Sequence, residues 1–157
     1  MESFDEFARK LLTEATENDF LGKAADAGQR ARAAAEAGQY DVAWRLYHEM
    51  REHYLRHAAR LRFTPAQTLA LDSRVSLPMA NILRLEGKHH DALVHIMYWV
   101  AADSKVTKAH AQKLGAYLKR CKLKGVTLEM VQRFIESIRP LPNFVQIRDE
   151  VAAWKSP

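Results

Sequence analysis

The sequence predicts an all-α protein, and three observations support that prediction. Residues that favour helices dominate the 157-residue chain. Apolar residues recur at intervals of three and four, as they do on one face of a helix, and no stretch alternates apolar and polar residues for long enough to predict a strand. Finally, a glycine-centred pattern recurs three times along the chain.

The glycine pattern predicts helical hairpins. Its first copy begins at Gly38 and reads G-x-Y-x-x-A-x-x-x-Y, and looser copies begin at Gly87 and Gly125. Glycine has the backbone freedom to end one helix and turn into the next. The small residue at the fifth position after it allows two helices to approach closely. We therefore expect Ala43 and Tyr47 to be buried between the second and third helices, and the hairpins to stack on one another.

The N-terminal part of the chain predicts three helices. Ser3 and Glu6 form a capping box that begins a helix over 4–17. A second helix, over 21–37, is rich in alanine, and its short side chains favour close packing. The third helix, over 41–62, carries the most regular apolar stripe in the chain.

Residues 64–86 predict further helix with an interruption. Thr64 and Gln67 form a second capping box, with Pro65 at the first helical position. Pro78 lies inside the periodic stretch that follows, where its ring would clash with the carbonyl of Arg74. We expect a kink or a break over 74–78.

The C-terminal part predicts four more helices. The pattern places them over 89–102, over 105–121, over 128–139 and from Asn143, which can cap a helix, to about Trp154. The total is eight helices, or nine if Pro78 breaks one.

The length suits one domain covering 1–157. Within it we expect an array of antiparallel helical hairpins, with a capping N-terminal helix in 1–20, three hairpin units in 24–142, and a capping C-terminal helix and tail in 143–157. The first residues are acidic, unlike a signal peptide, and the longest apolar stretch is too short to cross a bilayer. We expect the single cysteine, Cys121, to act as a small buried residue. A cytoplasmic protein is expected.

Charge is distributed unevenly along the chain. Residues 1–62 carry a net charge of −1, and residues 63–157 carry +6. The stretch 103–125 accounts for that excess, because its seven Lys and Arg residues face a single acid, Asp103. Such a stretch indicates an acidic partner surface, although a solvated helix face gives the same pattern.

The repeated glycine pattern resembles the tetratricopeptide repeat (TPR) family over residues 24–142. The turn glycines lie 49 and 38 residues apart, in place of the roughly 34 residues of that family. The family's first-helix pattern of tryptophan, leucine and glycine is largely missing. An irregular helical bundle is the alternative fold. In size and repeat number the chain is also similar to small secretion chaperones of bacteria.

The resemblance implies a binding groove. In TPR proteins the first helix of each hairpin lines a concave groove that holds a partner peptide or helix. The groove positions of the family can be transferred to this chain by their distance from each turn glycine, and most of the residues found there are basic. They are Arg32, Arg74, Asn81, Arg84, Gln112, Lys119 and Lys122. Arginine and lysine there can bind carboxylates. The same residues could instead form the wet side of amphipathic helices.

Catalytic and metal chemistry is not indicated. Glu49, His53 and His57 share one helical face at a spacing that zinc sites use, but a surface Glu–His pair is the favoured interpretation. No nucleophile elbow or phosphate-binding loop is present. We therefore expect a non-enzymatic protein–protein interaction module, adaptor or chaperone-like, without metal or cofactor. It would bind an acidic or carboxylate-bearing segment. The alternative is polyanion or nucleic-acid binding through 105–124.

Overall fold

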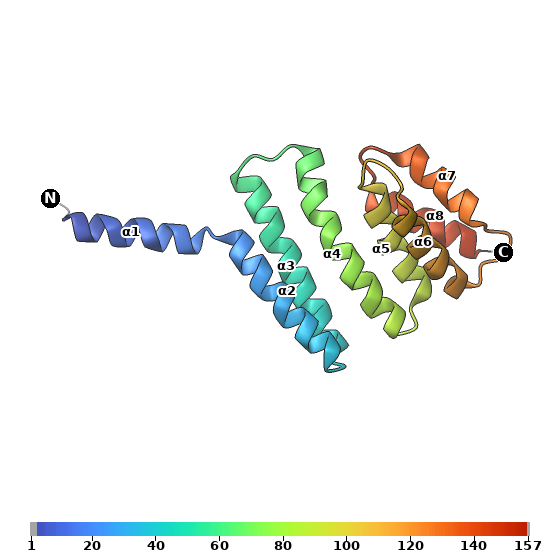
Figure 1. The fold of residues 1–157 in the computed structure, drawn as a ribbon, viewed down its shortest axis with the longest axis horizontal. Coiled ribbons are helices and arrows are strands. Elements are labelled where there is room, and N and C mark those ends of the chain that lie inside the picture. Colours follow the sequence, from blue (N-terminus) through green and yellow to red (C-terminus); the bar gives the residue numbers. More distant parts are fainter. Residues whose placement is uncertain (1–2, 157) are drawn as a thin grey trace.

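The computed structural model describes residues 3–156 and contains eight α-helices in that range, without a strand (Figure 1). The all-α prediction is confirmed. The helices are α1 (Phe4–Glu17), α2 (Phe20–Glu36), α3 (Tyr40–Arg60), α4 (Pro65–Leu85), α5 (His89–Ala101), α6 (Lys108–Cys121), α7 (Leu128–Ile138) and α8 (Phe144–Lys155). Contacts between helices lie mainly between neighbours in sequence. None of the helices within residues 3–156 is both long and apolar enough to cross a membrane.

Local capping explains where several helices begin. The predicted capping boxes at Ser3 and Thr64 are both formed, and the Asn143 side chain accepts hydrogen bonds from the first turn of α8. A further box, which the sequence analysis did not identify, joins Thr107 and His110 at the start of α6. Each cap satisfies backbone N–H groups that have no partner within the helix.

Two of the three predicted glycine hairpins are close pairs of helices. Gly38 and Gly87 both have φ of +77°, and the residue after each donates its N–H to a carbonyl in the last turn of the preceding helix. This is the Schellman arrangement that ends many helices. The third hairpin is different. Although Gly125 has φ of +72°, α6 already ends before Lys122, a left-handed residue, and α6 and α7 are barely in contact.

Of the kink or break predicted at Pro78, the break is wrong, because α4 is one continuous helix from Pro65 to Leu85. Proline inside a helix costs about 3 kcal/mol through a lost hydrogen bond and a clash. Val75, Met79 and Ile82 are each almost fully buried on either side of it. Burial of each such side chain contributes about 1.5–3 kcal/mol, so packing on both sides outweighs the proline.

The core has two parts that meet at α4. One part joins α2, α3 and α4, and it includes Ala43 and Tyr47, whose predicted burial is confirmed. The other is centred on α5, which is apolar on nearly every side. A helix of that kind must be covered all round, and α5 accordingly contacts α4, α6, α7 and α8.

The ends of the chain depart from the predicted capping of a hairpin array. The C-terminal helix α8 packs against α5, three helices earlier in the sequence. At the other end, α1 projects away from the rest of the molecule and buries no residue (Figure 1). The structure is therefore a set of consecutive helical pairs with a C-terminal group around α5, and a TPR-type superhelix is not shown.

Two glycine substitutions are expected to change stability in opposite directions. Gly87→Ala should destabilise the protein by about 1 kcal/mol, because alanine is strained at positive φ. Gly115→Ala is the matched control within α6. A β-carbon there would make only ordinary contact, 3.8 Å from Leu128 Cδ2, so better helix propensity should stabilise by about 0.5–1 kcal/mol. Denaturant unfolding measures both changes, and a shared sign would contradict the turn assignment.

Candidate functional site

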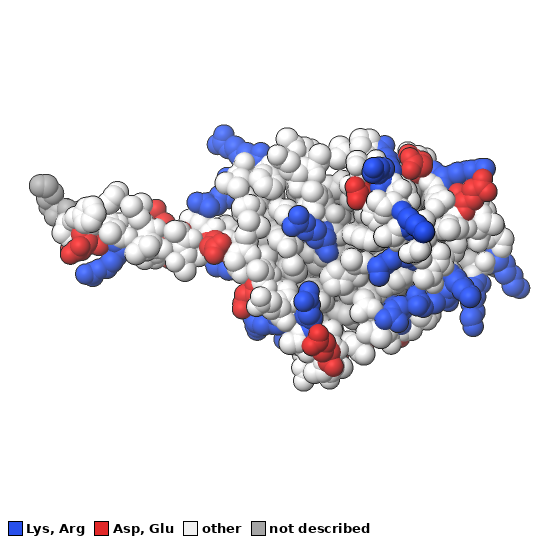
Figure 2. All heavy atoms as spheres, in the orientation of Figure 1, with Lys and Arg blue, Asp and Glu red and all other residues white. Residues whose placement is uncertain are grey.

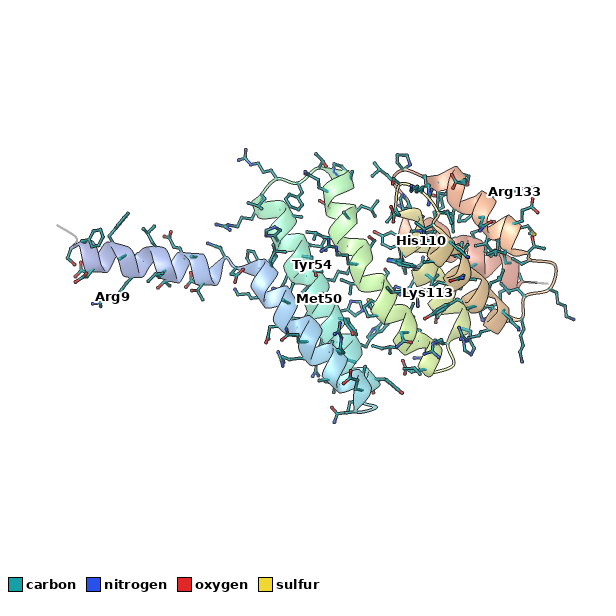
Figure 3. The ribbon with its side chains drawn as sticks, viewed as in Figure 1. Arg9, Met50, Tyr54, His110, Lys113 and Arg133 are labelled. Carbon is teal, nitrogen blue, oxygen red and sulfur yellow. The ribbon has the colours of Figure 1, made fainter. Side chains whose placement is uncertain are left out.

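A groove of about 590 Å³ lies where α2, α3, α4 and α6 meet. Its polar lining includes Arg32, Arg74, Asn81 and Lys113, and its apolar lining includes Met50, Leu77, Pro78 and Tyr117. Figure 3 shows Met50 on the α2–α3 side of α4, and Lys113 on the α6 side. The groove thus combines an apolar surface with several hydrogen-bond donors.

Small residues on α2 shape one wall of the groove. The face of α2 that packs against α3 is made of alanines, and these two helices form the most extensive helix contact in the molecule. A β-carbon at Gly28 would lie only 3.0 Å from Met50 Sδ and 3.1 Å from Met50 Cε. The absence of that β-carbon allows the Met50 side chain to pack against α2 at the edge of the groove.

The structure brings together four of the seven predicted groove residues. Arg32, Arg74 and Asn81 line the groove. Arg84 is tied to them indirectly, because its Nη2 and Nε donate to Asn81 Oδ1 at 2.6 and 3.2 Å. The other three predicted residues are exposed on or just after α6 and do not line the groove; they are Gln112, Lys119 and Lys122.

Lys113 is the groove cation that the sequence analysis missed. It lies one residue beyond the predicted Gln112 and four before Tyr117, whose ring also lines the groove. Residues four apart share a helix face. The spacing from Tyr117 was therefore a usable signal, whereas the offset from Gly125 was not, since α6 does not end at that glycine.

The groove is electropositive. Three Lys and Arg side chains line it without any Asp or Glu. On the face shown in Figure 2, Lys and Arg also predominate over the part of the molecule formed by α6 and α7. Burial raises the pKa of the Tyr47 phenol, and with the added effect of the Glu36 carboxylate it outweighs the lowering effect of nearby Arg32. Tyr47 therefore stays protonated at neutral pH and presents no negative charge to the groove.

A second, more enclosed cavity of about 200 Å³ lies between α3, α4, α5 and the start of α8. Asp72 is buried at its edge and connects three helices. It accepts hydrogen bonds from Arg51 on α3 (Nη2 at 3.3 Å, with Nε closer) and from the Tyr98 hydroxyl on α5, at 2.8 Å. A buried carboxylate needs such partners to offset its desolvation. The pair is 21 residues apart, so no local pattern could reveal it.

His95 faces the same cavity. Its Nδ1 lies 3.4 Å from Ser76 Oγ, and its ring packs against Phe144, with 4.9 Å between centroids. Burial, aided by the positive charges of Arg51 and His48, lowers the pKa of His95 to about 4. At neutral pH the ring is therefore uncharged.

On α3, the side chains that share the predicted metal-like spacing do not meet at one point. His53 Nε2 lies 3.6 Å from Glu49 Oε1, while His57 packs edge-on against Phe63, with 5.4 Å between ring centroids. Within residues 3–156, no three His, Cys, Asp or Glu side chains are grouped closely enough to hold a metal ion. Cys121 is buried as predicted, and burial raises the pKa of its thiol to about 11.

Every Lys and Arg residue of the basic stretch 105–124 is exposed. Its single aromatic ring, that of Tyr117, is buried, and the Arg120 guanidinium lies over it, 5.4 Å from the centroid. A buried ring cannot stack on a nucleic-acid base. The stretch therefore offers Lys and Arg side chains for phosphate contacts but no exposed Tyr, Phe or Trp ring for base stacking.

No protein-family model, curated protein or solved structure matches this chain. Function is therefore inferred from the geometry and chemistry of the groove.

Proposed function

We propose that this protein is a non-enzymatic interaction module, adaptor or chaperone-like, whose groove binds an acidic segment of a partner protein. One observation carries the proposal: among the described residues, the groove between α2, α3, α4 and α6 is lined by Arg32, Arg74 and Lys113 and by no Asp or Glu, and Glu36, which lies near Tyr47, is outside the lining. We also infer that the α2–α3 and α4–α5 hairpins are TPR-like, because both turns carry the glycine, aromatic or histidine, and alanine pattern of that family.

The chemistry of the lining suggests how a segment would be held. The guanidinium groups can each donate two parallel hydrogen bonds to a carboxylate, and Lys113 supplies a point charge. Between the cations, the partly exposed side chains of Met50, Leu77 and Pro78 offer an apolar surface for one or two apolar side chains of the partner. The charges would mainly raise the association rate and exclude basic segments, while apolar burial would contribute most of the affinity.

A charge-reversal pair tests the groove. Arg74→Glu combined with Lys113→Glu is expected to weaken binding of an acidic amphipathic peptide at least tenfold, because attraction becomes repulsion at both the α4 wall and the α6 wall of the groove. Both side chains are exposed, so the melting temperature should change by only a few degrees. Fluorescence anisotropy with acidic, neutral and basic peptides of matched hydrophobicity measures the effect.

The matched control is Arg45→Glu combined with Arg56→Glu. These exposed residues lie on α3, rotated away from its groove-lining Tyr47 and Met50 at the helical period. The control should bind the acidic peptide nearly as well as the wild type. Loss of binding in the control, with retention in the groove pair, would place the binding face on the opposite side of the hairpins.

Polyanion binding through 105–124 is the second candidate function, favoured by the full exposure of its cations. Phosphate-driven binding to duplex DNA would weaken steeply and log-linearly with salt. Reversal of Lys119 and Lys122, which lie outside the groove lining, would abolish it and leave peptide binding intact. Tight DNA binding at physiological salt, with no peptide binding, would favour this function over the groove.

A further inference from the structure

The N-terminal helix α1 exposes an apolar face that no other helix within the described residues 3–156 covers. It contains no buried residue, and Phe4 and Phe7 are 82% and 51% exposed. Leu11 and Leu12 are at least half exposed as well. Figures 1 and 3 show α1, with Arg9 labelled, extending away from the other helices. A helix of 14 residues is marginal alone in water, so a covering surface would stabilise it.

The charges of α1 are suited to a basic surface. Residues 4–17 carry four acidic and two basic side chains, a net charge of −2. At 100° per residue, Phe4, Phe7 and Leu11 form one stripe, bordered by Asp5 on one edge and by Glu14 on the other. A surface that receives the stripe would therefore meet a carboxylate on both sides of it.

The groove has the complementary composition. Its apolar lining can receive the stripe, and Arg32, Arg74 and Lys113 can meet the bordering carboxylates. The other open apolar cleft, of about 410 Å³, is lined by Leu55, Phe63, Leu69 and Leu141 among others. Among the described residues its only charged lining residue is Asp72, which already pairs with Arg51, so the cleft offers no cation to the bordering carboxylates. Charge complementarity thus selects the groove over the cleft.

The junction between α1 and α2 holds α1 away from the groove of its own chain. Asp19 caps α2 by accepting from the Gly22 N–H at 3.0 Å. Lys23 Nζ donates to the Glu17 carbonyl at 2.6 Å, and Arg60 Nη1 donates to the Asn18 carbonyl at 3.5 Å. Folding α1 back over α2 would disturb the contacts of Lys23 and Arg60 with the end of α1, whereas the groove of a second molecule is accessible without that change.

We infer that α1 docks in the groove of a second copy of this chain, and that two copies exchange their α1 helices in a symmetric dimer. The inference deepens the proposed function, on which it rests, by making α1 an occupant of the same groove. Mutual exchange covers the apolar stripe of each copy, and its twofold symmetry limits the assembly to two molecules. An external acidic segment must then compete with α1 for the groove.

Sedimentation equilibrium on the full chain tests the inference. The wild type is expected to dimerise. Phe7→Asp with Leu11→Asp should weaken dimerisation at least tenfold by placing charges in the apolar stripe, and Arg32→Glu with Arg74→Glu should do the same from the groove side. All four side chains are exposed, so circular dichroism should show unchanged folding of the other helices.

A charge exchange provides the specific control. Asp5→Lys with Glu14→Lys should also weaken the dimer, and its combination with Arg32→Glu and Arg74→Glu in one chain should restore it. A monomeric wild type at the highest soluble concentration would overturn the inference. So would a dimer that survives groove reversal and is dissociated by Leu141→Asp, since that result would place α1 in the apolar cleft.

The inference and the proposed function fail in distinguishable ways. The Phe7→Asp, Leu11→Asp variant should bind the acidic peptide several-fold more tightly than the wild type, because its groove is no longer occupied. If the variant and the wild type bind the peptide equally well and the wild type is monomeric, only the exchange of α1 helices is refuted. A groove-dependent dimer whose monomeric variant binds no acidic peptide supports the exchange and refutes the partner-binding function.

Discussion

Leu93→Ala is expected to destabilise the protein by about 3 kcal/mol. Leu93 is fully buried on α5, the helix that contacts α4, α6, α7 and α8. Truncation removes the transfer free energy of the deleted methyl and methine groups and leaves a cavity, since packing on several sides prevents collapse of one helix into the space. Urea unfolding followed by circular dichroism measures the change.

Leu85→Ala is the matched control. It makes the same chemical change eight residues earlier, at the end of α4, where the leucine side chain is 44% exposed. Its effect should stay within about 0.5 kcal/mol. Equal losses in the two variants would show that α5 is not the centre of the C-terminal core.

Acidification from pH 6.5 to pH 4 is expected to reduce the stability of the protein by up to about 3 kcal/mol through His95 alone. Burial is the main cause of its lowered pKa of about 4, with Arg51 and His48 adding to it and Asp72 opposing it. Above pH 6.5 the ring is neutral in both the folded and the unfolded chain. Below that pH the unfolded chain takes up a proton that the folded chain does not, so stability falls until about pH 4.

His95→Gln isolates this contribution, because glutamine keeps a polar side chain that does not titrate. Its free energy of unfolding, measured by urea denaturation from pH 7.5 to pH 4, should decline less steeply than that of the wild type. The difference between the two curves should grow through the window between pH 6.5 and pH 4. Parallel curves would show that His95 is solvated rather than held in the cavity beside Phe144.

Helix positions were largely predictable from the sequence because the signals that determine them are local. The capping boxes at Ser3 and Thr64 join residues three apart, and the turns at Gly38 and Gly87 depend on the conformation of one residue. The apolar period then identifies which face of each helix is buried. These signals act within about one helical turn, so they are present in the sequence whatever the rest of the chain does.

The candidate groove was predictable only in part. Arg32, Arg74 and Asn81 were identified from their distance to a turn glycine, which works where the helix ends at that glycine. On α6 the helix ends earlier, and the same rule selected Lys119 and Lys122 in place of Lys113. A register error of a few residues rotates a helix face by a large angle, so the error moved the predicted site off the groove.

By itself the sequence determined that the chain is helical, the approximate limits of most helices, and the basic character of the second half of the chain. Tertiary structure alone decided that α4 continues through Pro78, that α8 packs on α5, and that Asp72 pairs with Arg51 and Tyr98. These outcomes depend on side chains more than 20 residues apart in sequence or on packing from several helices at once. Their free energies appear only when the helices meet, and no local pattern encodes which helices those will be.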